Sequence, residues 1–157
     1  FNIVPFCRAL GNKCGFVIVP NINYKAENNF GSLALGSLET GEQVELQTLD
    51  YFALPLCNLI KVDVEGMEKE VLEGAKNTIA RFRPVLYLEN DKKDKQLELT
   101  AFVKSLGYRV FWHLPYLYNQ ENYKGDKENI FGDIVSINML CIPAEADANI
   151  NGLEEVL

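Results

Sequence analysis

The sequence predicts an α/β fold, in which helices cover a mostly parallel β-sheet whose last strand runs in the opposite direction. Apolar runs typical of buried strands alternate twice with helical patterns between residues 58 and 114. No helix fits between the last two predicted strands, so the final strand is expected to run antiparallel to its neighbours. The 157 residues, 48% of them hydrophobic, are enough for one core without metals or disulfides.

The N-terminal part, residues 1–56, contains short β-type runs separated by turn-rich segments. Val44, Leu46 and Thr48 alternate with polar residues, which predicts a strand with one face in the core and the other in water. Glycine and asparagine are frequent between the runs, as in turns. We therefore expect a β-hairpin or meander, with strands at residues 3–9, 16–20 and 44–48 and turns at 11–13 and 28–32.

The alternating part begins with residues 59–64. This mostly apolar run predicts a central strand. Apolar residues then recur at helical spacing from 67 to 79, so one face of a single helix is expected to pack on the sheet. The charged residues between them, Glu68 included, are expected on the solvated face. Pro84 ends this helix, because the residue before a proline is disfavoured in helical geometry.

The second strand and helix follow the same pattern. Residues 85–88 form an apolar run that predicts a buried strand, and residues 94–106 place their apolar side chains on one helical face. Gly107 occupies the position of a left-handed C-terminal cap. A third strand is predicted at residues 108–114.

The remaining segments complete the expected domain. Residues 115–133 are polar, aromatic and too long for a simple connection, which predicts a substrate loop. Residues 135–143 form the reversed strand, and the tail at 144–157 is expected to fray. The chain as a whole, residues 1–157, is expected to be one domain, in which a βαβαβ-β part at 58–143 follows the β-rich part.

Composition excludes several classes of protein. With 22 acidic and 15 basic side chains, the formal charge is −7, which argues against nucleic acid as a partner. No run approaches the roughly 18–20 apolar residues of a membrane-spanning helix, and the N-terminal residues do not have the basic-then-apolar layout of a secretory signal. A membrane-spanning or freshly targeted protein is therefore not expected. A small or neutral substrate is expected.

Four cysteines, Cys7, Cys14, Cys57 and Cys141, lie in apolar surroundings without close CxxC spacing, which predicts buried thiols. A disulfide between Cys7 and Cys14 across a hairpin is the alternative for an exported protein. The sequence also lacks an Asn-x-Ser/Thr glycosylation site, and a cytoplasmic location is expected.

Polar residues gather where the predicted parallel strands end, the edge at which open α/β sheets bind ligands. A glycine there permits a tight turn and close approach of a ligand. Singly, each residue has a structural explanation, such as a helix cap or a first-turn acid; together they favour a site. The residues are Asp63, Glu65 and Gly66 after the first strand, Glu89 and Asn90 after the second, and Trp112 and His113 near the end of the third.

Two further features have open interpretations. His113 is the chain's one histidine, and both proton transfer and a structural role are possible for it. Tyr116, Tyr118 and Tyr123 either line a pocket for a sugar or aromatic acceptor or anchor their loop to the domain. Cys57 has no evident activating base and is expected to serve packing.

Residues 59–90, LIKVDVEGMEKEVLEGAKNTIARFRPVLYLEN, resemble the FkbM-type methyltransferases, which depend on S-adenosylmethionine. KVDVEG followed by EVLEGA is fairly specific. The resemblance implies a Rossmann-like class I methyltransferase sheet, usually of seven strands with the last reversed. Supporting segments are Ala9-Leu10-Gly11, Gly31-Ser32-Leu33, Thr48-Leu49-Asp50, Gly107-Tyr108 and Asn138-Met139-Leu140.

The sequence departs from the family pattern at its N-terminal end. The glycine-rich loop that cradles the methionine part of the cofactor, and the acid that holds its ribose, are not present in these residues. The first residues look like the family's third strand, so the first two strands are expected to be missing. A sheet without them has an open edge beside residues 59–64, so the chain is either a fragment of a longer enzyme or a remnant that closes this edge by homo-oligomerisation.

The resemblance implies methyl transfer to the oxygen of a small-molecule or sugar hydroxyl. Asp63 and Glu65, which match DVEG, are expected nearest the methyl group and the acceptor, and Glu89 is expected to assist. The other expected roles are cofactor binding by Asp63 and Gly66, substrate binding by Asn90, Trp112 and Tyr118, and a back-up base in His113.

Two alternatives stay open. By strand position, Asp63, Glu89 and Asn90 resemble the residues that hold magnesium in catechol-type O-methyltransferases, although no metal is the first expectation. The competing function is that of a non-catalytic α/β module that binds a partner or a second copy through its open sheet edge.

Overall fold

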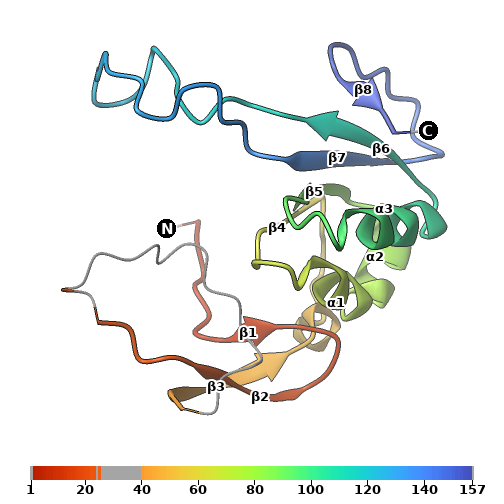
Figure 1. The fold of residues 1–157 in the computed structure, drawn as a ribbon. Coiled ribbons are helices and arrows are strands. Elements are labelled where there is room, and N and C mark those ends of the chain that lie inside the picture. The colour runs from red at the N-terminus through yellow and green to blue at the C-terminus, as the bar shows by residue number, and fades with distance from the viewer. Residues whose placement is uncertain (1, 24, 26–39, 157) are drawn as a thin grey trace. The chain divides into compact units, whose positions relative to one another are not determined.

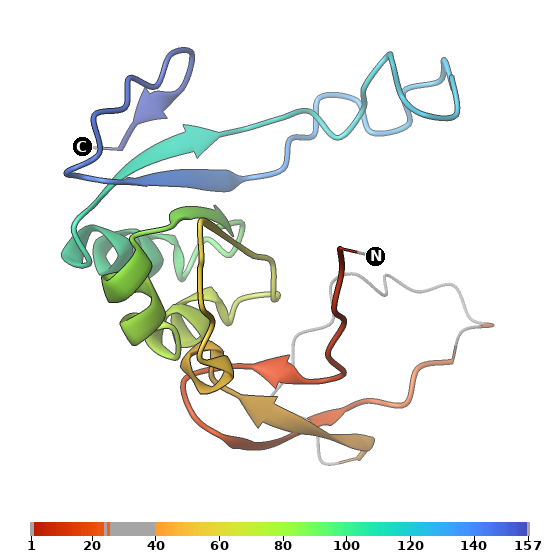
Figure 2. The ribbon, with the colours of Figure 1, turned by 180° about the vertical axis from the view of Figure 1, so that it is seen from behind.

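The computed structural model describes residues 2–23, 25 and 40–156. The chain forms two compact units, one of Phe1–Asn58 with Asp63–Arg83 and one of Leu59–Val62 with Pro84–Leu157. Each unit contains one sheet, and both sheets combine parallel and antiparallel pairs. Figures 1 and 2 show the elements from opposite sides. The predicted mixture of helices and strands is therefore confirmed, whereas a single mostly parallel sheet is not what the structure shows.

The first unit has a three-stranded sheet of order β1-β3-β2. β1 (Ala9–Leu10) runs parallel to β3 (Glu42–Gln47), and β2 (Gly15–Val19) runs antiparallel to it, with Val17 opposite Val44. The antiparallel pairing of β2 and β3 confirms the predicted hairpin element. A simple meander is wrong, because β3 lies between β1 and β2. The turn predicted at 28–32 and the segment Gly31-Ser32-Leu33 lie outside the described residues.

The first predicted strand, at residues 3–9, is reduced to Ala9–Leu10. Pro5 has no N–H to donate to a strand ladder. Phe6 instead packs edge-to-face on Phe52, with ring centroids 4.9 Å apart. Before Ala9, the described residues therefore make an aromatic contact and do not pair as a strand.

The single helix predicted to begin near Met67 and to end at Arg83-Pro84 is two helices, α1 (Glu68–Glu73) and α2 (Lys76–Phe82). At the break, the carbonyl of Gly74 accepts the N–H of Asp50, at 3.0 Å, at the start of the 3₁₀ helix η2 (Leu49–Phe52). A Cβ at Gly74 would collide with the carbonyl oxygen of Gly11. This close backbone approach requires glycine and interrupts the helix.

Asp50 also holds the start of α2. Its carboxylate accepts the N–H groups of Asn77 and Thr78, at 2.9 and 2.8 Å, and the hydroxyl of Thr78 at 2.7 Å. Burial by itself raises the pKa of Asp50, but these hydrogen bonds outweigh it and the pKa is lowered. At its other end α2 stops at Phe82, with Arg83 in left-handed geometry before the proline, as predicted.

The apolar face predicted for this helical region is confirmed, because Val71, Leu72, Ala75 and Ile79 are all buried. The prediction for Glu68 is wrong. Glu68 is only 6% exposed, so it does not lie on a solvated face. It is held in this buried position by hydrogen bonds to the preceding turn, described below.

The second unit has a five-stranded sheet of order β4-β5-β7-β6-β8. β4 (Leu59–Val62) is parallel to β5 (Val85–Glu89), with Val62 opposite Leu88. β7 (Asn138–Pro143) is antiparallel to both β5 and β6 (Tyr108–His113), which confirms the reversed strand. The strand predicted at 59–64 ends at Val62 and lies at one end of this order, not at its centre.

Helix α3 (Gln96–Ser105) precedes β6 and buries Leu99, Thr100 and Val103. It starts two residues later than predicted, and Gly107 has the positive φ, +78°, expected of its C-terminal cap. The core of this unit consists of side chains from several of these elements: Leu86, Leu88, Val103, Val110, Met139 and Cys141, each with no exposed surface.

The tail is not wholly irregular. Glu154–Glu155 form β8, which pairs with β6. The side chain of Arg109 donates to both carboxylate oxygens of Glu155, at 3.0 and 2.9 Å, and the N–H of Val156 donates to the carbonyl of Val110. The expected fraying is therefore wrong at residues 154–156, because a cross-strand ion pair, not an apolar pattern, holds this segment.

All four cysteines are thiols, as predicted. Cys57 and Cys141 are buried, and burial raises the pKa of Cys141 to about 12, so it stays an unreactive thiol at neutral pH. Cys7 and Cys14 are exposed, which corrects the prediction that all four are buried. Cys14 donates to the side chain of Gln47 at 3.0 Å.

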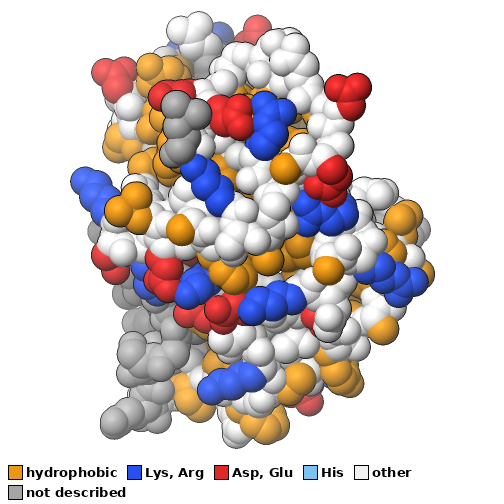
Figure 3. Space-filling view, turned by 90° about the vertical axis from the view of Figure 1, so that its right-hand side faces the viewer, with side chains coloured by type: hydrophobic (Ala, Val, Ile, Leu, Met, Phe, Trp, Pro, Cys, Tyr) orange, Lys and Arg blue, Asp and Glu red, His pale blue; other side chains and the backbone are white. Residues whose placement is uncertain are grey.

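Surface composition agrees with the mixed charge of the sequence. On the face that Figure 3 shows, Lys and Arg side chains lie beside Asp and Glu side chains, with hydrophobic groups between them. Among the described helices, none combines the length and apolar character needed to cross a bilayer.

Candidate functional site

The turn after β4 has an unusual backbone. Asp63 follows the last residue of β4, Glu65 has φ of +53° and Gly66 has φ of +94°. Left-handed geometry at a residue other than glycine costs on the order of 1–3 kcal/mol and persists only where the surroundings enforce it. Such strain is often found at functional sites, which makes this turn a candidate site.

Glu68 enforces the geometry of the turn. One of its carboxylate oxygens accepts the N–H of Val64 at 3.3 Å and the N–H of Gly66 at 3.0 Å. A buried carboxylate that receives two N–H donors keeps its acceptor capacity satisfied without water. Sequence reasoning missed Glu68. The available signal was an acid at the first position of a helix, where a side chain can reach back to the preceding N–H groups.

This turn lines a cavity of about 360 Å³ within the first unit. From the turn come the carboxylates of Asp63 and Glu65. Arg8, whose Nε lies 2.7 Å from a carboxylate oxygen of Glu45, also lines the cavity. The other lining residues are Ala9, Leu10, Val64 and Met67.

The cavity thus combines two carboxylates, one guanidinium and several apolar side chains. A carboxylate can accept a proton or a hydrogen bond from a hydroxyl, and it favours a positive charge on a ligand. Arg8 offsets part of the negative charge that the two acids bring together. Gly66, predicted to bind cofactor, is buried and does not line this cavity; its N–H and its positive φ serve the turn.

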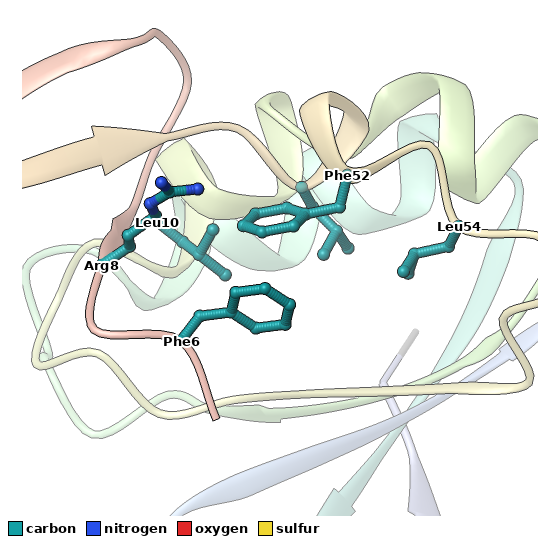
Figure 4. Close-up of a pocket in the computed structure, with 6 residues that line it drawn as sticks. Phe6, Arg8, Leu10, Phe52 and Leu54 are labelled. Atoms are coloured by element: carbon teal, nitrogen blue, oxygen red, sulfur yellow. The ribbon is translucent and has the colours of Figure 1, made fainter. Parts of the chain in front are cut away.

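A second cavity of the first unit, about 260 Å³, is mainly apolar. Figure 4 shows the rings of Phe6 and Phe52 and the side chain of Leu54 directed into a common space, with the guanidinium of Arg8 at its margin. Leu10 and Leu49 complete the lining. Sequence reasoning did not find this cavity, because Phe6 and Phe52 are 46 positions apart (52 − 6) and neither belongs to a periodic pattern.

Glu89 and Asn90 belong to the second unit. Glu89 is the last residue of β5, and Asn90 is 3% exposed. The side-chain nitrogen of Asn90 lies 3.4 Å from both the carbonyl of Gln96 and the hydroxyl of Thr100, and its backbone carbonyl accepts from the Gln96 side chain at 2.7 Å. These contacts fix the start of α3 to the end of β5. The predicted meeting of Glu89 and Asn90 with Asp63 stays a prediction.

Trp112 and His113 line a cavity of about 460 Å³ in the second unit, together with Glu154. Nδ1 of His113 lies 2.7 Å from the hydroxyl of Tyr87. Burial raises the pKa of Tyr87, and the positive charge of Lys61 lowers it by less. Tyr87 is therefore a protonated phenol at neutral pH and is able to donate to His113. The predicted roles of Trp112 and His113 stay predictions.

The predicted substrate loop extends the hairpin of β6 and β7. Tyr116 and Val135 form an isolated antiparallel bridge, and the loop beyond them reaches past the ends of both strands (Figures 1 and 2). The hydroxyl of Tyr118 donates to the carbonyl of Asp126 at 3.1 Å, inside the loop. Tyr123 is fully exposed. Tyr118 thus has a structural contact, and its predicted role in substrate binding stays a prediction.

Comparison with known proteins agrees with the resemblance seen in the sequence. A crystal structure of methyltransferase FkbM from Methylobacillus flagellatus KT is similar to this chain with a TM-score of 0.44 and 20% identity; the match covers 62% of this chain and 23% of that one. This chain therefore spans less than a quarter of the length of that protein. No curated protein matches it. The family model named methyltransferase FkbM domain matches residues 5–110 of the 157, and the chain belongs to this methyltransferase family.

Proposed function

We propose that this chain forms the acceptor side of an S-adenosylmethionine-dependent methyltransferase that modifies a hydroxyl of a small molecule or sugar. The observation that carries the proposal is the cavity lined by Asp63 and Glu65, which lies within the segment matched by the family. A strained turn held by a buried carboxylate presents these two acids.

The residues present fit part of the cofactor. Asp63 and Glu65 are suited to accept hydrogen bonds from hydroxyl or amino groups and to stabilise a nearby positive charge, and Leu10 and Met67 offer apolar surface. The volume of about 360 Å³ is near the lower end of the roughly 300–1,000 Å³ of ligand sites. No Gly-x-Gly segment occurs in the 157 residues. The cofactor, when bound, supplies a methyl group on a positively charged sulfur.

The contribution of this chain is to place and deprotonate the acceptor. A hydroxyl loses one proton when it is methylated, and the carboxylate of Asp63 would accept that proton with Glu65 assisting. Glu68 holds the turn, so both acids are already in position before the acceptor binds. Arg8 limits the repulsion between the acids and the developing negative oxygen.

The proposal keeps Glu89 as an assisting acid and His113 as a second base. The parallel register of β4 and β5, with Val62 opposite Leu88, supports the first assignment, because polar residues then follow both strands in the same direction. A magnesium ion at Asp63, Glu89 and Asn90 is the alternative way to acidify the hydroxyl. Dialysis against a chelator separates the two mechanisms: activity that survives it excludes the metal.

Calorimetric titration with S-adenosylhomocysteine tests the proposal. The wild-type chain is expected to bind it, and Asp63→Asn and Glu65→Gln are each expected to weaken binding at least about tenfold, since each removes a charged acceptor. Asp91→Asn is the matched control, because Asp91 is an exposed acid near a strand end that lines none of the cavities described. A folded sample that does not bind S-adenosylhomocysteine contradicts the proposal for this chain.

A second function is favoured by one observation. β4 lies at the end of the strand order β4-β5-β7-β6-β8 among the residues that the structure describes. A non-catalytic module that pairs with a second copy along β4 is therefore the competing proposal. Light scattering coupled to size-exclusion chromatography distinguishes them: a dimer without cofactor binding supports this module, and a monomer at all concentrations contradicts it. Four free thiols support a cytoplasmic location for either.

A further inference from the structure

The apolar cavity in Figure 4 is a second candidate site. It shares Arg8 and Leu10 with the cavity of Asp63 and Glu65, and the proposed methyl transfer uses none of its other four lining residues. Its volume is about 260 Å³. A cavity of roughly 150 Å³ is known to hold one benzene ring, so this space admits one ring with a substituent but not two rings. Five of the six lining residues are apolar, and all six belong to the first unit.

The aromatic residues of the cavity are incompletely packed. Phe6 is 60% exposed, although it makes an edge-to-face contact with Phe52. Leu10, Leu49, Phe52 and Leu54 are each only half-buried. Apolar side chains that face a water-accessible cavity release free energy when an apolar group displaces that water. An aromatic ring is suited to this space because it can stack on one phenylalanine while meeting the edge of the other.

Arg8 supplies the polar end of the site. Its Nε lies 2.7 Å from a carboxylate oxygen of Glu45, which holds the side chain in place. Figure 4 shows the guanidinium at the margin of the cavity. A guanidinium binds a carboxylate through paired N–H donors, and Nη1 and Nη2 carry four such N–H groups beyond the Nε contact. The ligand that fits is therefore apolar at one end and anionic at the other.

We propose that this cavity binds a small aromatic carboxylate, with its ring packed against the Phe6–Phe52 pair and its carboxylate on Arg8. The inference goes beyond the proposed function, because it needs neither the cofactor nor Asp63 and Glu65. It assigns a chemical class of ligand to residues of β1 and the segment before it, and to residues of η2 and the segment after it.

Phenylacetate is the probe for the test, and benzylamine, which carries a similar ring with the opposite charge, is its matched control. Titration of the full chain followed by NMR is expected to give saturable binding of phenylacetate, with a dissociation constant on the order of 1 mM or lower. Benzylamine is expected to bind at least about tenfold more weakly. Equal binding of the two, or no saturation by phenylacetate, overturns the proposal.

Variants separate a specific site from loss of folding. Leu54→Trp fills the cavity and is expected to abolish phenylacetate binding without lowering the unfolding temperature, while S-adenosylhomocysteine binding stays as in the wild type. Arg8→Met is expected to weaken phenylacetate at least about tenfold. The affinity for phenylacetate is compared between Phe6→Ala and Phe16→Ala. Phe16 is a matched control because these phenylalanines are 60% and 62% exposed and Phe16 does not line the cavity. Wild-type affinity in Leu54→Trp overturns the proposal.

Discussion

Two strand ends of this protein carry acid or amide residues at corresponding positions but use them differently. After β4, Asp63 and Glu65 line a cavity, and Glu65 has the left-handed backbone geometry that is unfavourable for a residue other than glycine. After β5, Asn90 is buried and its amide contacts the first residues of α3. At the end of β4, the polar residues line a ligand-sized cavity. At the end of β5, the amide of Asn90 joins the strand to helix α3.

The difference shows that a polar residue at a strand end is not by itself evidence of a site. What distinguishes the end of β4 is a backbone in an unfavourable conformation and a buried acid, Glu68, that keeps it there. The end of β5 has hydrogen bonds that stabilise the fold directly. Substitutions at the two ends are therefore expected to separate activity from stability.

The largest effect is expected from Glu68→Leu, which fills the same space but leaves the N–H groups of Val64 and Gly66 without their acceptor. Each unsatisfied buried donor costs about 1–3 kcal/mol, so the free energy of unfolding should fall by about 2 kcal/mol or more. Glu68→Gln keeps an acceptor oxygen and should lose less. Urea titration of both variants checks this. Equal stability of Glu68→Leu and the wild type would show that the turn is held by something else.

Asn90→Ala is expected to lower the free energy of unfolding by about 1–3 kcal/mol, because it leaves the hydroxyl of buried Thr100 and the backbone carbonyl of Gln96 without the amide. Binding of S-adenosylhomocysteine to the folded fraction should change little. The exposed neighbour gives the control, Asp91→Ala, which should change stability by less than about 0.5 kcal/mol. If Asn90→Ala abolished binding in a stable protein, both strand ends would belong to the site.

Asp50 provides a reference acid, because its carboxylate caps α2. Asp50→Ala removes the acceptor for the first N–H groups of α2 and should cost about 1 kcal/mol at neutral pH. Because the folded pKa of Asp50 lies below its usual 3.8, its contribution is present above that pH and is lost as pH falls through the lowered value. The difference between wild type and variant, measured by urea unfolding, should shrink below about pH 4. A constant difference down to pH 2 would contradict the capping role.

The smallest effect on stability is expected from Glu65→Gly. Glycine adopts positive φ without steric cost but loses more entropy on folding, so the net gain should be below about 1 kcal/mol. Affinity for S-adenosylhomocysteine should nevertheless fall, because the carboxylate is gone. Thermal unfolding and calorimetry on one sample measure both. A clear loss of stability would mean that Glu65 serves the fold and not a ligand.

Much of the second unit could be predicted from the sequence. Continuous apolar runs gave the strands now at β5, β6 and β7, and Gly107 marked the end of α3. These features depend on local patterns, which a sequence carries directly. β8 was missed because a two-residue strand held by the pair of Arg109 and Glu155 has no apolar periodicity.

The first unit was predicted less well, because its features depend on contacts between distant segments. Gly74 splits a periodic helix only because the backbone of Gly11 approaches it. Phe6 leaves the expected strand for a contact with Phe52. For the site, DVEG pointed to Asp63 and Glu65, but Arg8 and Glu68 depend on how the turn folds and had no distinctive local pattern.

Transfer of a labelled methyl group from S-adenosylmethionine to a panel of hydroxylated sugars and small molecules tests the account most directly. The account predicts that the wild-type chain and Asp91→Asn label an acceptor at similar rates. It predicts a rate at least about a hundredfold lower for Asp63→Asn at unchanged stability, because the proton acceptor is lost. Labelling by Asp63→Asn at the wild-type rate would contradict the assignment of the turn after β4 as the reactive site.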